Sequence, residues 1–225
     1  MITLYHCVSA RSFRPLWILE ELRLPYELKM LPFPPRFLAR DYLEVNALGT
    51  VPTLIDGNVH MTESAAMCQY LAAKCDGSGS LDVPSSDPAF GFYLNWLHFG
   101  EATLTYPQTL VLRYGRFEPI ERRNAQVEQD YRRWFLARLR IIDPILSSQP
   151  YLCASRFTAA DISVGYALML AEYLDMAPQF STAISEYWER LKQRAGYLRA
   201  IAAQSASALA QGVSTVPAPL SANEK

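Results

Sequence analysis

The sequence predicts an α/β domain with a mixed four-stranded sheet, followed by an all-helical bundle domain. Residues 1–31 have the pattern of a strand, a helix and a second strand, and a short hairpin pattern surrounds Gly57-Asn58. From residue 87 onward, apolar side chains recur at helical spacing. These three observations define the fold class.

The first 31 residues form a strand–helix–strand unit. Ile2–His6 is a short strand, and residues 25–31 alternate apolar and polar side chains, as a half-buried strand does. The segment between them carries apolar side chains at helical spacing, namely Phe13, Leu16, Trp17, Leu19 and Leu22. Such units cross over with a right hand, so the first two strands are predicted to be parallel.

Turn residues organise the rest of this domain. Residues 37–46 are predicted to form a brief helix or an irregular segment. Thr53–Asp56 and Val59–Met61 flank a two-residue turn and are predicted to form a tight hairpin. A helix from Glu63 to about Cys75 then closes the domain.

Composition places the domain boundaries. The first domain covers residues 1–76, and residues 77–86 have the Gly, Ser and Pro content of a linker. A helical domain of residues 87–209 follows. Residues 210–225 have no periodicity and are expected to form a mobile tail.

Two long helices are predicted to begin the helical domain. Asp87 caps the first, with Pro88 at its first position, and Pro107 interrupts it. Its buried stripe consists of Phe92, Trp96, Leu97 and Phe99. The second helix runs from about Pro119 to Leu146. Its inward side chains are Ile120, Val127, Tyr131, Trp134, Leu139, Ile142 and Leu146.

A firm helix start is predicted further along this domain. Thr158 and Asp161 form a variant of the capping box, and Phe157 with Ile162 stands where a hydrophobic staple would. The helix that follows is apolar nearly all round from Val164 to Leu174, which predicts burial in the middle of a bundle.

Charge and composition restrict the class of partner. The 225 residues include 21 Lys+Arg and 22 Asp+Glu, and the resulting formal charge of −1 argues against a nucleic acid or an anionic membrane surface as the partner. No apolar run approaches the ~20 residues that span a bilayer, and no cleavable leader is evident, so a cytoplasmic protein is expected. The cysteines and histidines show no zinc-ligand spacing, so no metal is expected.

The segment Gly49–Leu54 offers a free backbone edge. Pro52 has no N–H, and the Val51-Pro52 pair stands at the mouth of a short strand. If Pro52 is cis, the chain turns sharply and leaves the N–H and C=O of Val51 outside the sheet. These two groups can then bind the backbone of an extended peptide.

The segment Thr62–Ala66 offers a helix start with charge. Thr62 is predicted to be the N-cap, with Glu63 and Ser64 in the first turn, where unpaired N–H groups attract a carboxylate. Glu63 can bind an amino group of the same ligand. The two segments together therefore favour a small zwitterionic peptide as the ligand.

These segments resemble the glutathione-binding signature of the cytosolic glutathione S-transferases, in a serine-type or related bacterial-like member. Residues 4–22 are similar to the first strand and helix of that family, and residues 157–161 resemble the start of its buried C-terminal helix. The resemblance implies a thioredoxin-like first domain, glutathione as co-substrate, a small hydrophobic electrophile and a homodimer. It places the glutathione contacts on Thr50, Val51, Pro52, Glu63 and Ser64.

The chemistry implied by this resemblance needs the glutathione thiol as a thiolate. Lowering a thiol pKa by about two units requires roughly 2.7 kcal/mol of preference for the anion. A hydroxyl donor to the sulfur can supply about 1.5–3 kcal/mol, and a helix N-terminus adds ~0.3–1. One hydroxyl at the start of the first helix is therefore sufficient.

The position of the hydroxyl that would donate to the sulfur differs here from the family pattern. Ala10 stands where members with a Ser-Arg-Ser-x-Arg-like segment have their serine, whereas members with a Ser-Ser-Cys-Ser start match at Ser9. Arg11 stands where cysteine-type members have their cysteine. The catalytic candidates are therefore the Ser9 and Ser12 hydroxyls, with Arg11 supplying positive charge or an N–H group.

Two other functions compete with the transferase. A glutathione-dependent disulfide or dehydroascorbate reductase needs a reactive cysteine, and only Cys7 is near the first helix. A non-catalytic glutathione-binding protein would keep the fold without a sulfur activator, which Ala10 favours. The electrophile site is predicted to include His98, Glu101, Tyr106 and Arg113.

Overall fold

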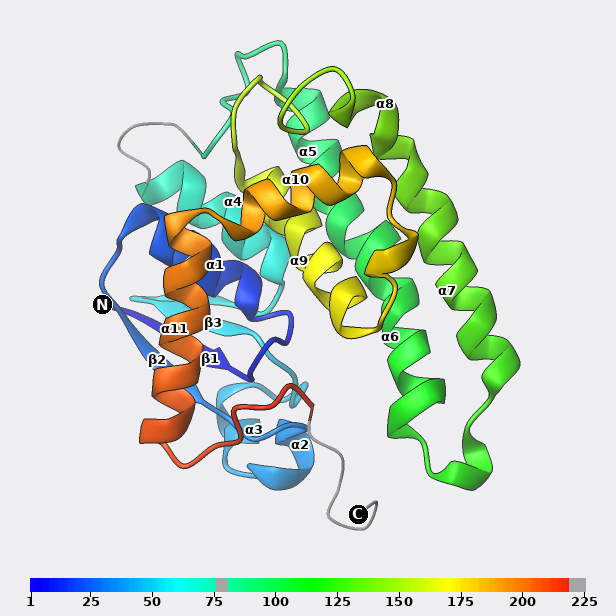
Figure 1. Ribbon diagram of the computed structural model, residues 1–225. Coiled ribbons are helices and arrows are strands. Elements are labelled where there is room, and N and C mark those ends of the chain that lie inside the picture. The colour runs from blue at the N-terminus through cyan, green and yellow to red at the C-terminus, as the bar shows by residue number, and fades with distance from the viewer. Residues whose placement is uncertain (76–80, 219–225) are drawn as a thin grey trace. The chain divides into compact units, whose positions relative to one another are not determined.

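The chain folds into two compact units in the computed structural model, which describes residues 1–75 and 81–218 (Figure 1). The first unit combines residues 1–77 with residues 193–225, and the second consists of residues 78–192. The chain therefore leaves the first unit, builds the second and returns to complete the first.

The first unit contains one mixed four-stranded sheet among its described residues. Its strands are β1 (Ile2–His6), β2 (Tyr26–Met30), β3 (Thr53–Asp56) and β4 (Val59–Met61). In the order β2-β1-β3-β4, β1 pairs parallel to β2 and antiparallel to β3, which pairs antiparallel to β4. The predicted sheet, with its parallel first pair and its hairpin, is confirmed.

Helix α1 (Phe13–Leu22) lies at the centre of this unit. It packs against both α4 (Ser64–Cys75) and α11 (Ala195–Ala210), and every side chain from Phe13 to Leu19 is buried. Because α1 is buried on two sides, its apolar residues cover more than one face of the helix. The segment between β2 and β3 holds two short helices, α2 (Pro35–Leu38) and α3 (Tyr42–Val45).

Side chains at both ends of α11 fasten it to α1 and β2, and Figure 1 shows the helix alongside them. Arg194 forms an ion pair with Glu21 of α1, with 2.8 Å between Nε and Oε1. The Gln211 amide donates to the Leu28 carbonyl and accepts from the Met30 N–H, both at 2.9 Å. These bonds occupy backbone groups of the edge strand β2.

The compact units divide the chain differently from the sequence-based boundaries. The sequence assigned residues 87–209 to the helical domain, whereas the contacts of α11 lie in the first unit. Long-range pairs such as Arg194 with Glu21 produce this difference. Local sequence patterns do not predict such pairs. The boundaries themselves stay a prediction, and residues 76–80 and 219–225 of the predicted linker and tail lie outside the described residues.

The described part of the second unit is helical (Figure 1). Its elements are α5 (Phe90–His98), η1 (Phe99–Thr105), α6 (Tyr106–Leu112), η2 (Arg113–Phe117), η3 (Ile120–Arg122), α7 (Ala125–Leu139), η4 (Arg140–Ile142), α8 (Asp143–Leu146), α9 (Ala159–Tyr173), η5 (Ala177–Gln179) and α10 (Thr182–Lys192). Segments η1 and η2 are π-helical, and η3, η4 and η5 are 3₁₀ turns.

Helix α9 has the predicted cap and the predicted burial. The Thr158 N–H donates to Asp161 Oδ2 at 2.8 Å, and the reciprocal bond from the Asp161 N–H to the Thr158 side chain completes the capping box. The other Asp161 oxygen accepts from the Leu152 N–H and the Tyr187 hydroxyl. Burial raises the pKa of Asp161 to about 6, although these hydrogen bonds oppose the shift. The body of α9 is buried on all sides, as predicted.

The predicted start of the first long helix was wrong by two residues. The Asp87 carboxylate accepts from the Ala89 N–H at 2.7 Å and so caps a turn, and α5 begins only at Phe90. Pro107 does not end the helical path either. It lies in the first turn of α6, directly after the π-helical η1, where its missing N–H interrupts no α-helical ladder.

The second long helix begins later than predicted. Two of its predicted inward side chains are also exposed. Asn124 caps α7 by accepting from the Val127 N–H at 3.1 Å, so the helix begins after it. Ile120 and Trp134 are exposed, whereas Phe135 is fully buried. The predicted inward residues Leu139 and Ile142 are buried, and Phe92 of α5, predicted to be buried, is exposed.

Gly100 generates a prediction about the packing of the second unit. An added Cβ would lie 2.5 Å from Ser163 Oγ and 2.6 Å from the Ser163 carbonyl carbon on α9. Gly100→Ala is therefore expected to lower the free energy of unfolding by about 1–3 kcal/mol. The matched control is Gly91→Ala, because a Cβ there meets nothing within 4 Å; it should raise stability by about 0.5–1 kcal/mol. Urea unfolding of both variants measures the difference, and equal stabilities would contradict this packing.

Candidate active site

Three loops of the first unit emerge at the same edge of its sheet. The register places Tyr5 opposite Thr53, and β4 runs antiparallel to β3. The C-terminal end of β1, the N-terminal end of β3 and the C-terminal end of β4 therefore lie side by side. The loops at these ends are residues 7–12, residues 50–52 and residues 62–63, which carry most of the predicted site residues.

Polar side chains hold the loop that leads into β3. The Tyr42 hydroxyl and the Asn46 amide donate to the Thr50 carbonyl at 2.8 and 2.9 Å. Both side chains also contact the Thr53 hydroxyl, at 2.6 and 3.1 Å. Tyr42 and Asn46 are buried, so these bonds are shielded from water. The loop is fixed by two residues of the α3 segment that the sequence analysis had not singled out.

The predicted backbone edge lies in this loop. The peptide bond between Val51 and Pro52 is cis. The registered pairs between β1 and β3 begin at Thr53, so Val51 lies outside the ladder among the described residues. Pro52 is buried, while Thr50 is exposed and Val51 is partly exposed.

The start of α4 lies one residue later than predicted. The Glu63 carbonyl accepts the first helical bond, from the Met67 N–H at 2.9 Å, so Glu63 and not Thr62 occupies the N-cap position. The Glu63 side chain is exposed, and Ser64 is buried at the first position of the helix.

A buried cation supports this helix start. Arg14 of α1 is fully buried, and its Nη1 donates to Ser64 Oγ at 3.0 Å. Its charge and the positive end of the α4 dipole therefore act in the same place. Such an arrangement stabilises an anion bound at the helix start.

The turn between β1 and α1 separates the two candidate hydroxyls. Ser12 is fully buried, and its Oγ accepts from the Cys7 N–H at 3.3 Å and donates to the Cys7 carbonyl at 3.4 Å. Ser9 and Arg11 are partly exposed. Ser9 has a φ of 52°, in the left-handed region that non-glycine residues seldom adopt. Of the two hydroxyls, only that of Ser9 therefore lies at the surface of the turn.

Gln204 of α11 reaches into this turn. Its Oε1 lies 3.0 Å from both the Ser9 nitrogen and His6 Nε2, and its Nε2 donates to Ser9 Oγ at 3.3 Å. Burial lowers the pKa of His6 to about 4, although hydrogen bonds from its surroundings oppose the shift. His6 is therefore a neutral ring at physiological pH.

The cysteines near the site are not activated. Cys7 and Cys68 are buried, and burial raises the pKa of each thiol to about 12. Burial also raises the pKa of Cys153 in the second unit to about 11. A reactive thiol needs the opposite shift, toward the thiolate. The geometry therefore disfavours the reductase alternative, which depended on Cys7.

The second unit contains the residues predicted for the electrophile site. His98 ends α5, Tyr106 begins α6, and both are exposed. Glu101 lies in η1. Arg113 begins η2, and its Nε donates to Glu118 at 2.8 Å. All four lie on consecutive helical segments of this unit.

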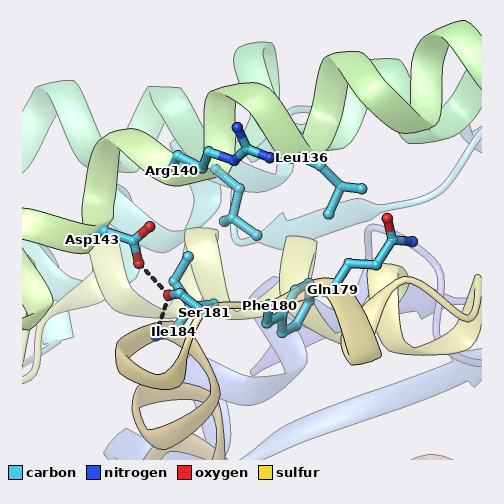
Figure 2. A pocket seen from close by; sticks show the side chains of 8 residues that line it. Leu136, Arg140, Asp143, Gln179, Phe180, Ser181 and Ile184 are labelled. Atoms are coloured by element: carbon cyan, nitrogen blue, oxygen red, sulfur yellow. Dashed lines mark hydrogen bonds between the residues drawn. The ribbon is translucent and has the colours of Figure 1, made fainter.

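A cavity of about 180 Å³ lies elsewhere in the second unit (Figure 2). It is lined by Leu136, Leu139, Arg140, Asp143, Gln179, Phe180, Ser181 and Ile184. Figure 2 shows Ser181 bonded to the Asp143 carboxylate and to the Ile184 N–H, which makes Ser181 a cap for α10. Asp143 and Ser181 in this cavity thus serve the start of α10, and no predicted site residue lines the cavity.

Neither a metal-ligand cluster nor a membrane-spanning helix occurs among the described residues. Across residues 1–75 and 81–218, no group of three or more His, Cys, Asp or Glu side chains is placed to hold a metal ion. In this part of the chain, no helix combines the length and hydropathy needed to cross a bilayer.

A thioredoxin-like domain joined to a helical domain defines the class of glutathione transferase folds. The glutathione S-transferase N-terminal domain matches residues 8–74. Glutathione S-transferase 3 of Schizosaccharomyces pombe is 30% identical over 192 residues, which cover 79% of this chain and 78% of that protein. Glutathione S-transferase hmp2 of Hypomyces subiculosus is 33% identical over 172 residues, which cover 72% and 78%.

A solved structure agrees with these relatives. Glutathione transferase URE2P6 from Phanerochaete chrysosporium, in complex with oxidized glutathione, is 26% identical, with a TM-score of 0.79 over 88% of this chain and 94% of that chain. The chain belongs to the glutathione S-transferase family. The predicted family, fold class and enzyme class are confirmed.

Cys7 generates a prediction that separates transferase from reductase chemistry. With a thiol pKa of about 12, the thiolate fraction at neutral pH is on the order of 10⁻⁵. The native protein is therefore expected to resist alkylation at Cys7 by iodoacetamide, measured by peptide mass spectrometry. Unfolded protein is the control, because there the same cysteine reacts. Rapid alkylation of native Cys7, or a Cys7 mixed disulfide with glutathione, would contradict this and revive the reductase.

Proposed function

We propose that this chain binds glutathione at the sheet edge formed by residues 7–12, 50–52 and 62–64, and transfers it to a small hydrophobic electrophile by a serine-type mechanism. The convergence of these three loops is the observation that carries the proposal. It brings together the Val51 backbone, the charged start of α4 and the Ser9 hydroxyl within the first unit.

The binding roles follow from the chemistry of each group. The N–H and C=O of Val51 pair with the backbone of glutathione, beside Thr50 and Pro52. The Glu63 carboxylate binds the glutathione ammonium group. The Ser64 hydroxyl and the first N–H groups of α4 bind the neighbouring carboxylate. The buried Arg14 donates to Ser64 Oγ and so places its positive charge close to the bound carboxylate.

The Ser9 hydroxyl is the proposed donor to the glutathione sulfur. Ser9 is partly exposed, whereas Ser12 is fully buried and bonded to the Cys7 backbone. Ser12 therefore holds the turn, and Ser9 contacts the thiolate. Arg11 adds positive charge at the same turn.

The transfer step uses this thiolate as the nucleophile. The thiol gives its proton to water, and the sulfur lone pair forms a bond to the electrophilic carbon. The leaving group departs with the bonding electron pair, or an added double bond takes up a proton from water. Tyr106, Arg113, His98 and Glu101 of the second unit are the proposed contacts of the electrophile.

Assembly and location complete the proposal. The family resemblance supports a homodimer in the cytoplasm. It also supports glutathione as co-substrate without a metal. Ala10 stands where many relatives have serine, so the contact to the sulfur is assigned to another residue of this turn.

The binding site is tested at the start of α4. Ser64→Ala and Glu63→Gln are each expected to weaken glutathione binding tenfold to over a hundredfold, because each removes a charge-assisted bond worth about 1.5–3 kcal/mol. Glu44→Gln is the matched control, an exposed acidic residue of α3 in the same unit. Calorimetry measures the affinities. Undiminished affinity in both site variants would remove this helix start from the site.

The catalytic role is tested by the thiol pKa of bound glutathione, read from thiolate absorbance against pH. A serine donor holds this pKa below the ordinary value of about 8.5. Ser9→Ala is expected to raise it by about one to two units with nearly unchanged affinity, since one unit corresponds to 1.36 kcal/mol. Ser12→Ala should leave it unchanged and lower stability. An ordinary thiol pKa in the parent protein would contradict the proposed activation of the thiol at this turn.

A further inference from the structure

One buried amide side chain holds three groups of the active-site turn. Gln204 lies in α11, 195 residues along the chain from Ser9, and only 3% of its surface is exposed. Its Oε1 is 3.0 Å from the Ser9 nitrogen and from His6 Nε2. Its Nε2 donates to Ser9 Oγ at 3.3 Å. A single residue thus contacts the backbone and the hydroxyl of Ser9 at once.

The neighbouring groups determine which way the amide faces. The Ser9 N–H can only donate, so it needs the amide oxygen. His6 then donates its Nε2–H to the same oxygen, which fixes the ring tautomer. The amide NH₂ consequently faces Ser9 Oγ, and the serine oxygen accepts from it. A hydroxyl that accepts a hydrogen bond becomes a stronger donor through its own hydrogen, because bonded dipoles polarise one another.

The backbone of Ser9 needs such support. Its φ of 52° lies in the left-handed region, which is unfavourable for a residue with a Cβ. The bond from the Ser9 N–H to Gln204 Oε1 offsets part of this cost. Alanine follows Ser9 in the turn, so the position where many relatives have serine offers no hydroxyl to replace it.

We infer that Gln204 is the positioning residue of the sulfur-contacting serine: it holds the Ser9 backbone in the left-handed conformation and orients the Ser9 hydroxyl as a donor to the thiolate. The C-terminal helix α11 is thereby part of thiol activation. This inference rests on the proposed role of Ser9.

Helix α11 is well suited to hold Gln204 in place. The Tyr197 ring packs edge-on against the rings of Phe13 and Trp17, with centroids 5.6 and 4.9 Å apart. Arg194 pairs with Glu21 before the helix, and Gln211 bonds to β2 after it. The helix is therefore fixed on both sides of Gln204, and the amide has a defined direction.

The test measures the thiol pKa of glutathione bound to Gln204→Met and Gln204→Glu, together with the pH profile of kcat/KM. Methionine keeps the length but neither bonding group. Glutamate keeps the acceptor for Ser9 N–H but lacks the NH₂ donor to Ser9 Oγ. Each variant is expected to raise the thiol pKa by about one unit. At a pH below the thiol pKa of both the parent protein and the variant, this shift lowers the thiolate fraction about tenfold.

Two comparisons separate positioning from a loss of structure. Gln211→Met is the matched control, because it removes a glutamine of the same chain end that bonds only to the edge of β2 in the described contacts. It should alter thermal stability but not the thiol pKa. The double variant Ser9→Ala with Gln204→Met should match Ser9→Ala alone, because an effect that acts through Ser9 disappears with its hydroxyl. Gln204→Glu provides a folded variant if Gln204→Met does not fold.

The outcomes distinguish this inference from the function on which it rests. If Ser9→Ala raises the thiol pKa and neither Gln204 variant does, the inference is overturned and the proposed function stands. If the Gln204 and Ser9 effects add in the double variant, Gln204 acts independently of Ser9, and the inference is also overturned. If Ser9→Ala leaves the thiol pKa unchanged, the role of Ser9 fails and the inference fails with it. A raised pKa in both Gln204 variants with no further change in the double variant supports it.

Discussion

The antiparallel pairing of β3 with β1 is the constraint on which the site depends. Because β3 reverses direction against a parallel β1–β2 pair, its entry loop meets the exit loop of β1 at one edge. The hairpin to β4 then returns the chain to that edge, where α4 begins. A parallel β3 would carry residues 50–52 to the opposite edge. The proposed ligand contacts come from separate parts of the first 64 residues, and strand direction alone therefore brings them together.

Buried polar groups then give this edge its chemistry. Arg14 lies beneath the start of α4, Gln204 lies beneath the active-site turn, and Tyr42 holds the loop before β3. Each of these side chains is at most a few per cent exposed and bonds to a residue of one of the site segments. Burial makes such bonds stronger than they would be in water, and it also makes an unmatched partner costly. The exposed residues of the proposed site thus depend on buried partners.

The sequence predicted the parts of the fold that local patterns control. The strand bounds of the hairpin and the capping box at Thr158 are properties of a few adjacent residues, and both are confirmed. The inward face of α7 was harder to predict, because Trp134 and Phe135 are adjacent aromatics and only one can point to the core. The predicted site residues came from recognisable short motifs. Arg14 was detectable as a cation inside an apolar helical run, whereas Gln204 lies in an Ala-rich helix and only its long-range contacts reveal it.

The return of α11 to the first unit has a consequence for how the protein is made. A ribosome releases the sheet first, then residues 78–192, and the final helix last. Until α11 has been synthesised, the rings of Phe13 and Trp17 lack the Tyr197 ring against which they pack. A nascent chain that ends at residue 192 lacks α11 and therefore lacks the Gln204 contacts to Ser9. If Ser9 acts as proposed, glutathione activation is therefore gained only when translation reaches the last helix.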